Sequence, residues 1–118
     1  AGVDLELLSR DVSDLLPQFA TSEELELLAG LPVESAHTNW PLRLWCAKES
    51  ASKLMGTGLQ GAPKDFEVVD AESERELLVQ HLPTGFRTRV HLLTMDNYLI
   101  AYTDAHDIVL DGELVQHG

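Results

Sequence analysis

The sequence predicts an α+β fold in which a small antiparallel sheet packs against one long helix. Residues 3–7, 86–94 and 98–103 alternate apolar and polar side chains with the period of a half-buried strand. Residues 40–55 instead repeat their apolar positions every three or four residues, as an amphipathic helix does. A sheet and a helix that each have one apolar side can bury both by packing together.

The size and charge of the chain narrow the possible functions. Its 118 residues correspond to a single domain, 1–118, and no apolar run approaches the roughly 20 residues that span a bilayer. The net charge of -12 makes nucleic acid and anionic membranes poor partners, so an anionic substrate would need a metal ion or a local basic cluster. Cys46 is the only cysteine, and we expect a reducing, cytoplasmic location. The start at Ala1, without an initiator Met, leads us to expect a domain of a longer chain or a processed product.

Capping signals indicate where the helices begin and end. Thr21 is followed three residues later by Glu24, which is the pattern of a capping box before a short helix over residues 25–29. Asn39 is suited to cap the long helix at its start, and Gly56 is suited to end it. The long helix is therefore expected over residues 40–55.

The second half of the chain predicts mainly strands. Residues 66–69 form one short strand, and residues 96–97 are the turn between the last two strands. Residues 72–81 stay ambiguous, because their Glu-rich start favours a helix whereas residues 77–79 favour a strand. The tail from residue 104 onward is expected to be peripheral.

Asp4 and Glu6 lie two residues apart in the first predicted strand, so their carboxylates project from the same face of it. Val3, Leu5 and Leu7 project from the opposite face. Spacing alone favours a solvated acidic face on an edge strand, because such alternation is common in half-buried strands.

The long helix carries a second group of charged residues. Glu49 and Lys53 are four residues apart and would form a surface ion pair worth about 0.2–0.5 kcal/mol. Trp45 lies one turn before Glu49 on the same side, which indicates that this side is buried or lines a cleft. Lys48 adds a second ammonium group, so a phosphate and metal site is the alternative to a plain ion pair.

Both groups belong to motifs of a known family. Residues 2–6, GVDLE, resemble the G-[IV]-D-[IL]-E motif of the surfactin-type 4'-phosphopantetheinyl transferases. Residues 45–53, WCAKESASK, resemble their W-x-x-K-E-[AS]-x-x-K motif, and residues 56–59 resemble the Gly-rich exit of the helix that carries it. Two motifs in the right order and separation are a specific signal, and the resemblance covers residues 2–103.

The resemblance implies a reaction and a role for each matching residue. A serine hydroxyl of an acyl or peptidyl carrier protein would attack the β-phosphate of coenzyme A, take up 4'-phosphopantetheine and release adenosine 3',5'-bisphosphate. Asp4, Glu6 and Glu49 match the acidic positions around Mg2+, a hard cation that takes oxygen ligands. Glu49 is also the candidate base for the serine proton. Lys48 and Lys53 match the lysines that contact the coenzyme A phosphates.

The chain also departs from the family in one respect. Full-length surfactin-type enzymes have two similar halves, and this chain resembles the second half only. The holo-acyl-carrier-protein synthases have one such domain per chain and form trimers with sites between subunits, and residues 56–58 resemble that branch. Residues 4–6, and the absence of a Ser-[IVL]-[ST]-His motif near the end, favour the surfactin-type branch, including domains fused into polyketide synthases.

These features lead us to expect a homo-oligomer or a partner half-domain, because no motif in the chain replaces the coenzyme A contacts of the missing half. Two other interpretations stay open from the sequence. One is a catalytically incomplete half-domain with a structural or carrier-docking role. The other is an unrelated acidic protein-interaction domain.

Overall fold

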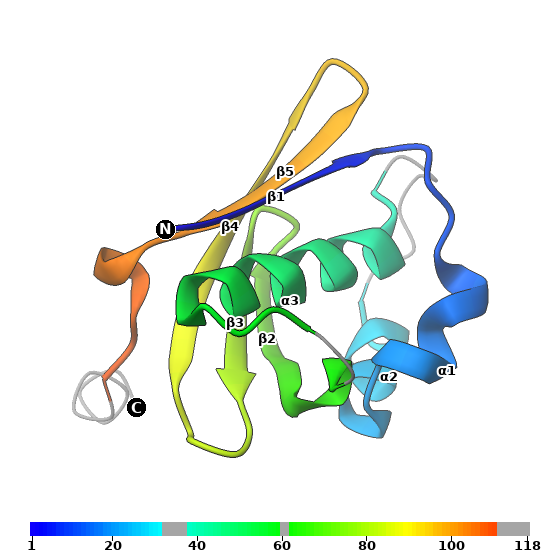
Figure 1. Ribbon diagram of the computed structural model, residues 1–118. Helices are drawn as coiled ribbons and strands as arrows, with labels where there is room; N and C mark the ends of the chain where they lie inside the picture. Colours follow the sequence, from blue (N-terminus) through cyan, green and yellow to red (C-terminus); the bar gives the residue numbers. More distant parts are fainter. Residues whose placement is uncertain (32–37, 60–61, 111–118) are drawn as a thin grey trace.

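The computed structural model describes residues 1–31, 38–59 and 62–110, and it confirms the predicted α+β architecture (Figure 1). Five strands form one sheet in the order β1-β5-β4-β3-β2, and every neighbouring pair is antiparallel. The strands are β1 (Gly2–Leu7), β2 (Phe66–Ser73), β3 (Glu76–His81), β4 (Arg87–Met95) and β5 (Tyr98–Thr103). The first strand in the chain therefore lies at an edge of the sheet, beside the last strand.

One long helix covers one face of this sheet, and two short helices lie near the β2 edge (Figure 1). The helices are α1 (Leu16–Phe19), α2 (Ser22–Ala29) and α3 (Trp40–Met55), with 3-10 turns at Ser13–Leu15, Pro63–Asp65 and Ala105–Asp107. The bounds of α3 are those that the sequence predicted. Within the described residues, no helix is long and apolar enough to cross a membrane.

Asn39 begins α3 and also ties it to the chain that follows β1. Its side chain accepts a hydrogen bond from the backbone N–H of Leu42 at 3.4 Å and donates to the carbonyls of Leu8 and Arg10 at 2.9 and 3.0 Å. Asn39 has a φ of 48°, in the left-handed region that asparagine tolerates better than most residues. Gly56, with a φ of 77°, ends the helix as expected.

The hydrophobic core lies between α3 and the inner face of the sheet. Its buried members on α3 are Leu42, Leu44, Cys46, Ala47 and Ala51, and those on the sheet include Val68, Leu77, Val79, Val90, Leu92, Leu99 and Ala101. The sheet residues alternate along their strands with side chains that are partly or fully exposed. The core therefore fixes α3 against the sheet from β5 to β2.

The ambiguous segment, residues 72–81, proves to be extended. β2 continues to Ser73, the chain turns, and β3 pairs back along it, with Ala71 opposite Leu77. Leu77 and Val79 are buried under α3, so core packing outweighs the helix propensity of the preceding glutamates.

The expectation of a peripheral tail from residue 104 was wrong for the described part. Asp104 caps a short 3-10 turn, after which Ile108 forms a bridge with Thr88 of β4. The N–H of Val109 then donates to the carbonyl of Arg87 at 3.0 Å, and Val109 is buried. Residues 111–118 lie outside the described residues.

Candidate functional site

β1 lies directly against α3 because residue 2 has no side chain. A Cβ atom on Gly2 would lie 1.9 Å from the carbonyl oxygen of Ser50 in α3, far inside van der Waals contact. The hydroxyl of Ser50 donates to the carbonyl of Gly2 at 2.8 Å. The two motif segments, far apart in sequence, are therefore held in direct contact (Figure 1).

Asp4 and Glu6 share one face of β1, as predicted, but that face points toward α3 and not to solvent. Asp4 is 7% exposed and Glu6 is partly buried. Val3, Leu5 and Leu7, on the other face, are each about half exposed. The interpretation of a solvated acidic face is therefore wrong, and the strand buries its acidic side in preference to its apolar side.

Asp4 forms an incomplete ion pair. Lys53 donates from Nζ to Asp4 Oδ1 and to the carbonyl of Val3, both at 3.0 Å, and this bond to Asp4 raises the pKa of Lys53. The predicted ion pair of Lys53 with Glu49 does not form; in the described residues Lys53 pairs with Asp4. Asp4 Oδ2 is the one buried side-chain polar atom that lacks a partner in the described part of the chain. Burying a carboxylate oxygen without a partner is costly, so this atom is suited to a ligand.

Glu49 lies close enough to both carboxylates of β1 to feel their charge. Burial and the negative charge of Asp4 raise the pKa of Glu49, Glu6 adds to this, and Lys53 and Arg10 oppose it. Glu6 itself pairs with Arg10, with 2.8 Å between Oε2 and Nη1. Three carboxylates thus repel one another between β1 and α3, and a divalent cation would relieve that repulsion.

The side chains as they stand do not form a complete metal site. Among the described residues, no three histidines, cysteines or carboxylates are close enough to share an ion. Asp4 and Glu6 each hold a cationic side chain, Lys53 and Arg10 respectively. The free oxygen of Asp4, the raised pKa of Glu49 and the all-oxygen donor set nevertheless fit Mg2+ in kind.

Lys48 differs from the expectation that it contacts coenzyme A. Its side chain has no exposed surface, and Nζ donates to Glu24 Oε1 at 2.9 Å and to the carbonyl of Phe19. Burial lowers the pKa of Lys48, and the charge of Glu24 opposes that shift. A fully enclosed ammonium cannot reach a soluble phosphate without rearrangement, so in this structure Lys48 serves the fold.

Glu24, the partner of Lys48, joins three elements. The predicted capping box is confirmed, since Thr21 and Glu24 bond each other's backbone N–H at 2.9 and 3.1 Å. Glu24 Oε2 also accepts the N–H of Val68 in β2 at 2.8 Å. The capping box could be identified from sequence, but nothing in the sequence indicated that its glutamate would also hold Lys48 and β2.

Cys46 lies next to the acidic residues but is not a candidate nucleophile. It is fully buried, and burial together with the charge of Asp4 raises the pKa of its thiol. The thiol therefore stays protonated at neutral pH.

β1 and α3 thus carry Asp4, Glu6, Glu49 and Lys53 close to one another. The chain matches the 4'-phosphopantetheinyl transferase superfamily over residues 1–103, which include all five strands and α3. The chain therefore belongs to this superfamily, as the resemblance of its two motifs indicated. The search of curated proteins gave no match to this chain.

Proposed function

We propose that the chain transfers 4'-phosphopantetheine from coenzyme A to a serine of an acyl or peptidyl carrier protein, with Mg2+ as cofactor. One observation carries the proposal. In a member of this superfamily, burial and the charges of Asp4 and Glu6 on β1 raise the pKa of Glu49 on α3, and Asp4 retains a buried oxygen without a partner among the described residues.

Each acidic residue has a proposed role. Asp4, Glu6 and Glu49 would hold Mg2+, which when bound neutralises the pyrophosphate and stabilises charge on the leaving phosphate. Glu49, whose pKa is raised by burial and Asp4, is the group suited to accept the serine proton, directly or through a water. A bound cation would keep Glu49 ionised, and so able to accept a proton, by lowering its raised pKa.

The two lysines take different roles in the proposal. Lys53, whose side chain is 46% exposed, is the lysine available to contact a phosphate of coenzyme A. A cation bound to Asp4 would displace the ammonium group of Lys53 from Oδ1. The ammonium would then be free to contact the substrate. Lys48 holds α3 in place through its pair with Glu24. The next residue, Glu49, would thereby stay directed at β1.

The outer face of β1 and β5 is the proposed contact with a second copy of the chain or a partner half-domain. Its exposed apolar side chains are Val3, Leu5, Leu7, Tyr98 and Tyr102. Stable protein interfaces bury about 800 Å2 on each partner, and apolar side chains in adjacent strands supply a patch of the right kind. We place the protein in the cytoplasm, in keeping with a single buried, free cysteine, Cys46.

A transfer assay tests the proposed activity. The chain is incubated with Mg2+, fluorescent coenzyme A and an apo-carrier protein, and label on the carrier is measured by gel and mass spectrometry. We expect labelling that EDTA abolishes and excess Mg2+ restores, and no labelling of a carrier whose acceptor serine is replaced by alanine. Absence of labelling by a folded chain, both alone and with a partner half-domain added, with every carrier class tested would reject the activity.

Light scattering tests the proposed partner. We expect a dimer or larger assembly, or a monomer that becomes active only when a partner half-domain is added. A strictly monomeric chain with full transfer activity would contradict the proposed contact on β1 and β5.

A second function has one observation in its favour. Among the described residues no three ligands converge on an ion, and both acidic residues of β1 are paired with cationic side chains. A catalytically incomplete half-domain that only docks a carrier would show this arrangement. Carrier binding without any Mg2+-dependent binding of coenzyme A would favour it over the transferase.

A further inference from the structure

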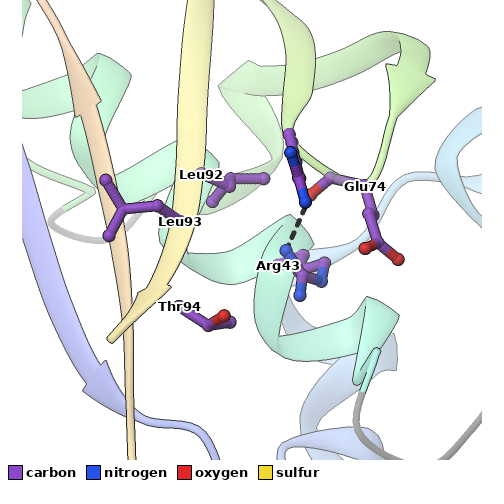
Figure 2. Close-up of a pocket in the computed structure, with 6 residues that line it drawn as sticks. Arg43, Glu74, Leu92, Leu93 and Thr94 are labelled. Atoms are coloured by element: carbon purple, nitrogen blue, oxygen red, sulfur yellow. Dashed lines mark hydrogen bonds between the residues drawn. The ribbon is translucent and has the colours of Figure 1, made fainter. Parts of the chain in front are cut away.

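A cavity of about 210 Å3 lies between the start of α3, the turn that joins β2 to β3, and β4 (Figure 2). Its lining residues are Arg43, Glu74, Arg75, Leu92, Leu93 and Thr94. None of these residues belongs to the proposed transfer site. The cavity contains two of the eight basic residues of a chain whose net charge is -12.

Arg43 is held rigidly at the wall of this cavity. It is 4% exposed, and it donates from Nε to the carbonyl of Thr38 at 2.5 Å and from Nη1 to the carbonyl of Glu74 at 2.6 Å (Figure 2). These bonds fix the plane of the guanidinium and leave Nη2 without a hydrogen-bond partner among the described residues. Burial lowers the pKa of Arg43, and the charge of Glu74 opposes that shift.

The hydrogen bonds of Arg43 to described residues use two of the five N–H donors of its guanidinium. The cavity is the space that Arg43 lines, and a guanidinium that is already oriented loses little freedom when an oxyanion binds it.

Arg75 supplies a second guanidinium beside the same cavity. Its carbonyl accepts the N–H of Leu92 at 2.8 Å, which fixes the turn against β4, while its exposed side chain forms no ion pair with any described residue. Glu74 is the one carboxylate in the lining, and its side chain extends away from β4 in Figure 2. Two guanidiniums and one carboxylate leave the lining with a net positive charge.

We propose that this cavity binds a small oxyanion, a phosphate or carboxylate group carried on a short apolar stem. The two guanidiniums suit a planar or tetrahedral oxyanion, and the hydroxyl of Thr94 adds a further donor. Leu92, whose side chain points toward Arg43 in Figure 2, gives the stem an apolar wall. The volume equals about seven molecules of liquid water, which limits the ligand to a few carbon atoms besides the anionic group. This inference does not rest on the proposed transfer reaction.

Titration of the isotope-labelled chain with n-butyrate, inorganic phosphate and neutral n-butanol, followed by NMR at constant ionic strength, tests the inference. We expect saturable shifts of the amides of Arg43, Arg75 and Thr94 with both anions, with a dissociation constant of about 1–10 mM. Arg75→Gln should weaken binding about tenfold, because it removes a charged donor. Arg89→Gln is the matched control, since it removes one guanidinium from β4 outside the cavity lining.

Three results would overturn the proposal. The first is the absence of saturation at about 50 mM of either anion. The second is equal weakening by Arg75→Gln and Arg89→Gln, which would show a general effect of net charge. The third is binding of n-butanol as tight as that of n-butyrate, which would show an apolar pocket. Arg75→Gln is the decisive variant because Arg75 is exposed, whereas substitution of Arg43 also removes two bonds that hold the backbone.

Discussion

Two lysine–carboxylate pairs on α3 have nearly the same length and opposite surroundings. Lys48 and Glu24 lie 2.9 Å apart with neither side chain exposed, whereas Lys53 and Asp4 lie 3.0 Å apart with side-chain exposures of 46% and 8%. In the first pair both oxygens of Glu24 accept hydrogen bonds. In the second pair Asp4 keeps one oxygen without a partner in the described residues. The same helix thus carries one complete charge network and one incomplete network.

The difference between these pairs separates a contact that stabilises the fold from a contact that can be exchanged for a ligand. A buried charge pair is tolerated when all its hydrogen bonds are made, and removing one partner is then severe. An exposed lysine bound to a partly satisfied carboxylate can exchange its partner for a metal ion at small cost. Lys48 therefore belongs to the scaffold, whereas Lys53 and Asp4 are the pair that the proposed function places at the site.

The largest effect is expected from breaking the buried pair. Lys48→Met keeps the length of the side chain but leaves the carboxylate of Glu24 buried without its charge partner. We expect a loss of about 3–5 kcal/mol in the free energy of unfolding, measured with urea and circular dichroism. Lys53→Met should lose about 1 kcal/mol or less, because its pair is partly solvated.

The double variant Lys48→Met with Glu24→Gln is the control for this comparison. It removes both charges but leaves one side-chain oxygen to accept from either Thr21 or Val68, so it should recover only part of the lost stability. Equal losses in Lys48→Met and Lys53→Met would show that the two pairs do not differ as proposed.

Local sequence signals predicted the fold well, because they depend on near neighbours. The bounds of α3, the capping box of α2 and the alternation in β5 all follow from residues within a few positions of one another. The surroundings of Lys48 and of Glu49, in contrast, depend on contacts with residues far away in the sequence. Lys48 and Glu49 are adjacent, yet a rotation of about 100° per residue turns one toward α2 and the other toward β1. Only the tertiary packing of α2 and β2 determines which side is enclosed.

The orientation of β1 shows the same limit. Alternation predicted that Asp4 and Glu6 share a face, but not which face packs against the helix. Burial of apolar area alone would turn Val3, Leu5 and Leu7 inward. The structure turns the acidic face inward because Gly2 permits contact with α3 and Lys53 and Arg10 neutralise the carboxylates. A sequence argument based on apolar burial therefore fails at this strand, as it commonly does at functional sites.

A second effect, on catalysis and not on stability, is expected at Glu49. Glu49→Gln keeps the size of the side chain and removes its charge, so transfer to a carrier protein should fall by at least about 10²-fold. Burial and Asp4 raise the pKa of Glu49 in the folded state, so protonated Glu49 favours folding and this contribution is lost as pH rises through the raised pKa. The variant should therefore be as stable as the original chain at pH 7, or more stable, and the two should converge below the ordinary pKa of 4.5.

Thermal melts at several pH values measure the effect of Glu49→Gln on stability. A transfer assay on the same preparation measures its effect on activity. Near-normal transfer by Glu49→Gln would remove Glu49 from the proposed mechanism. A large loss of stability at pH 7 would instead show that the charged form of Glu49 supports the fold.

The smallest expected effects are those of Lys53→Gln, and they have opposite signs for the two ligands. Lys53 occupies Asp4 Oδ1, so it competes with a metal ion for that oxygen, and its removal should strengthen binding of Mg2+ alone by about two- to fivefold. The same ammonium is the proposed contact with a coenzyme A phosphate, so affinity for coenzyme A in saturating Mg2+ should fall by a similar factor. Calorimetry measures both constants, and Arg89→Gln corrects for the change of one unit in net charge. If Lys53→Gln weakens the binding of both Mg2+ and coenzyme A, Lys53 has a general role in holding β1 against α3. If it changes neither affinity, the pair of Lys53 with Asp4 is an ordinary surface contact.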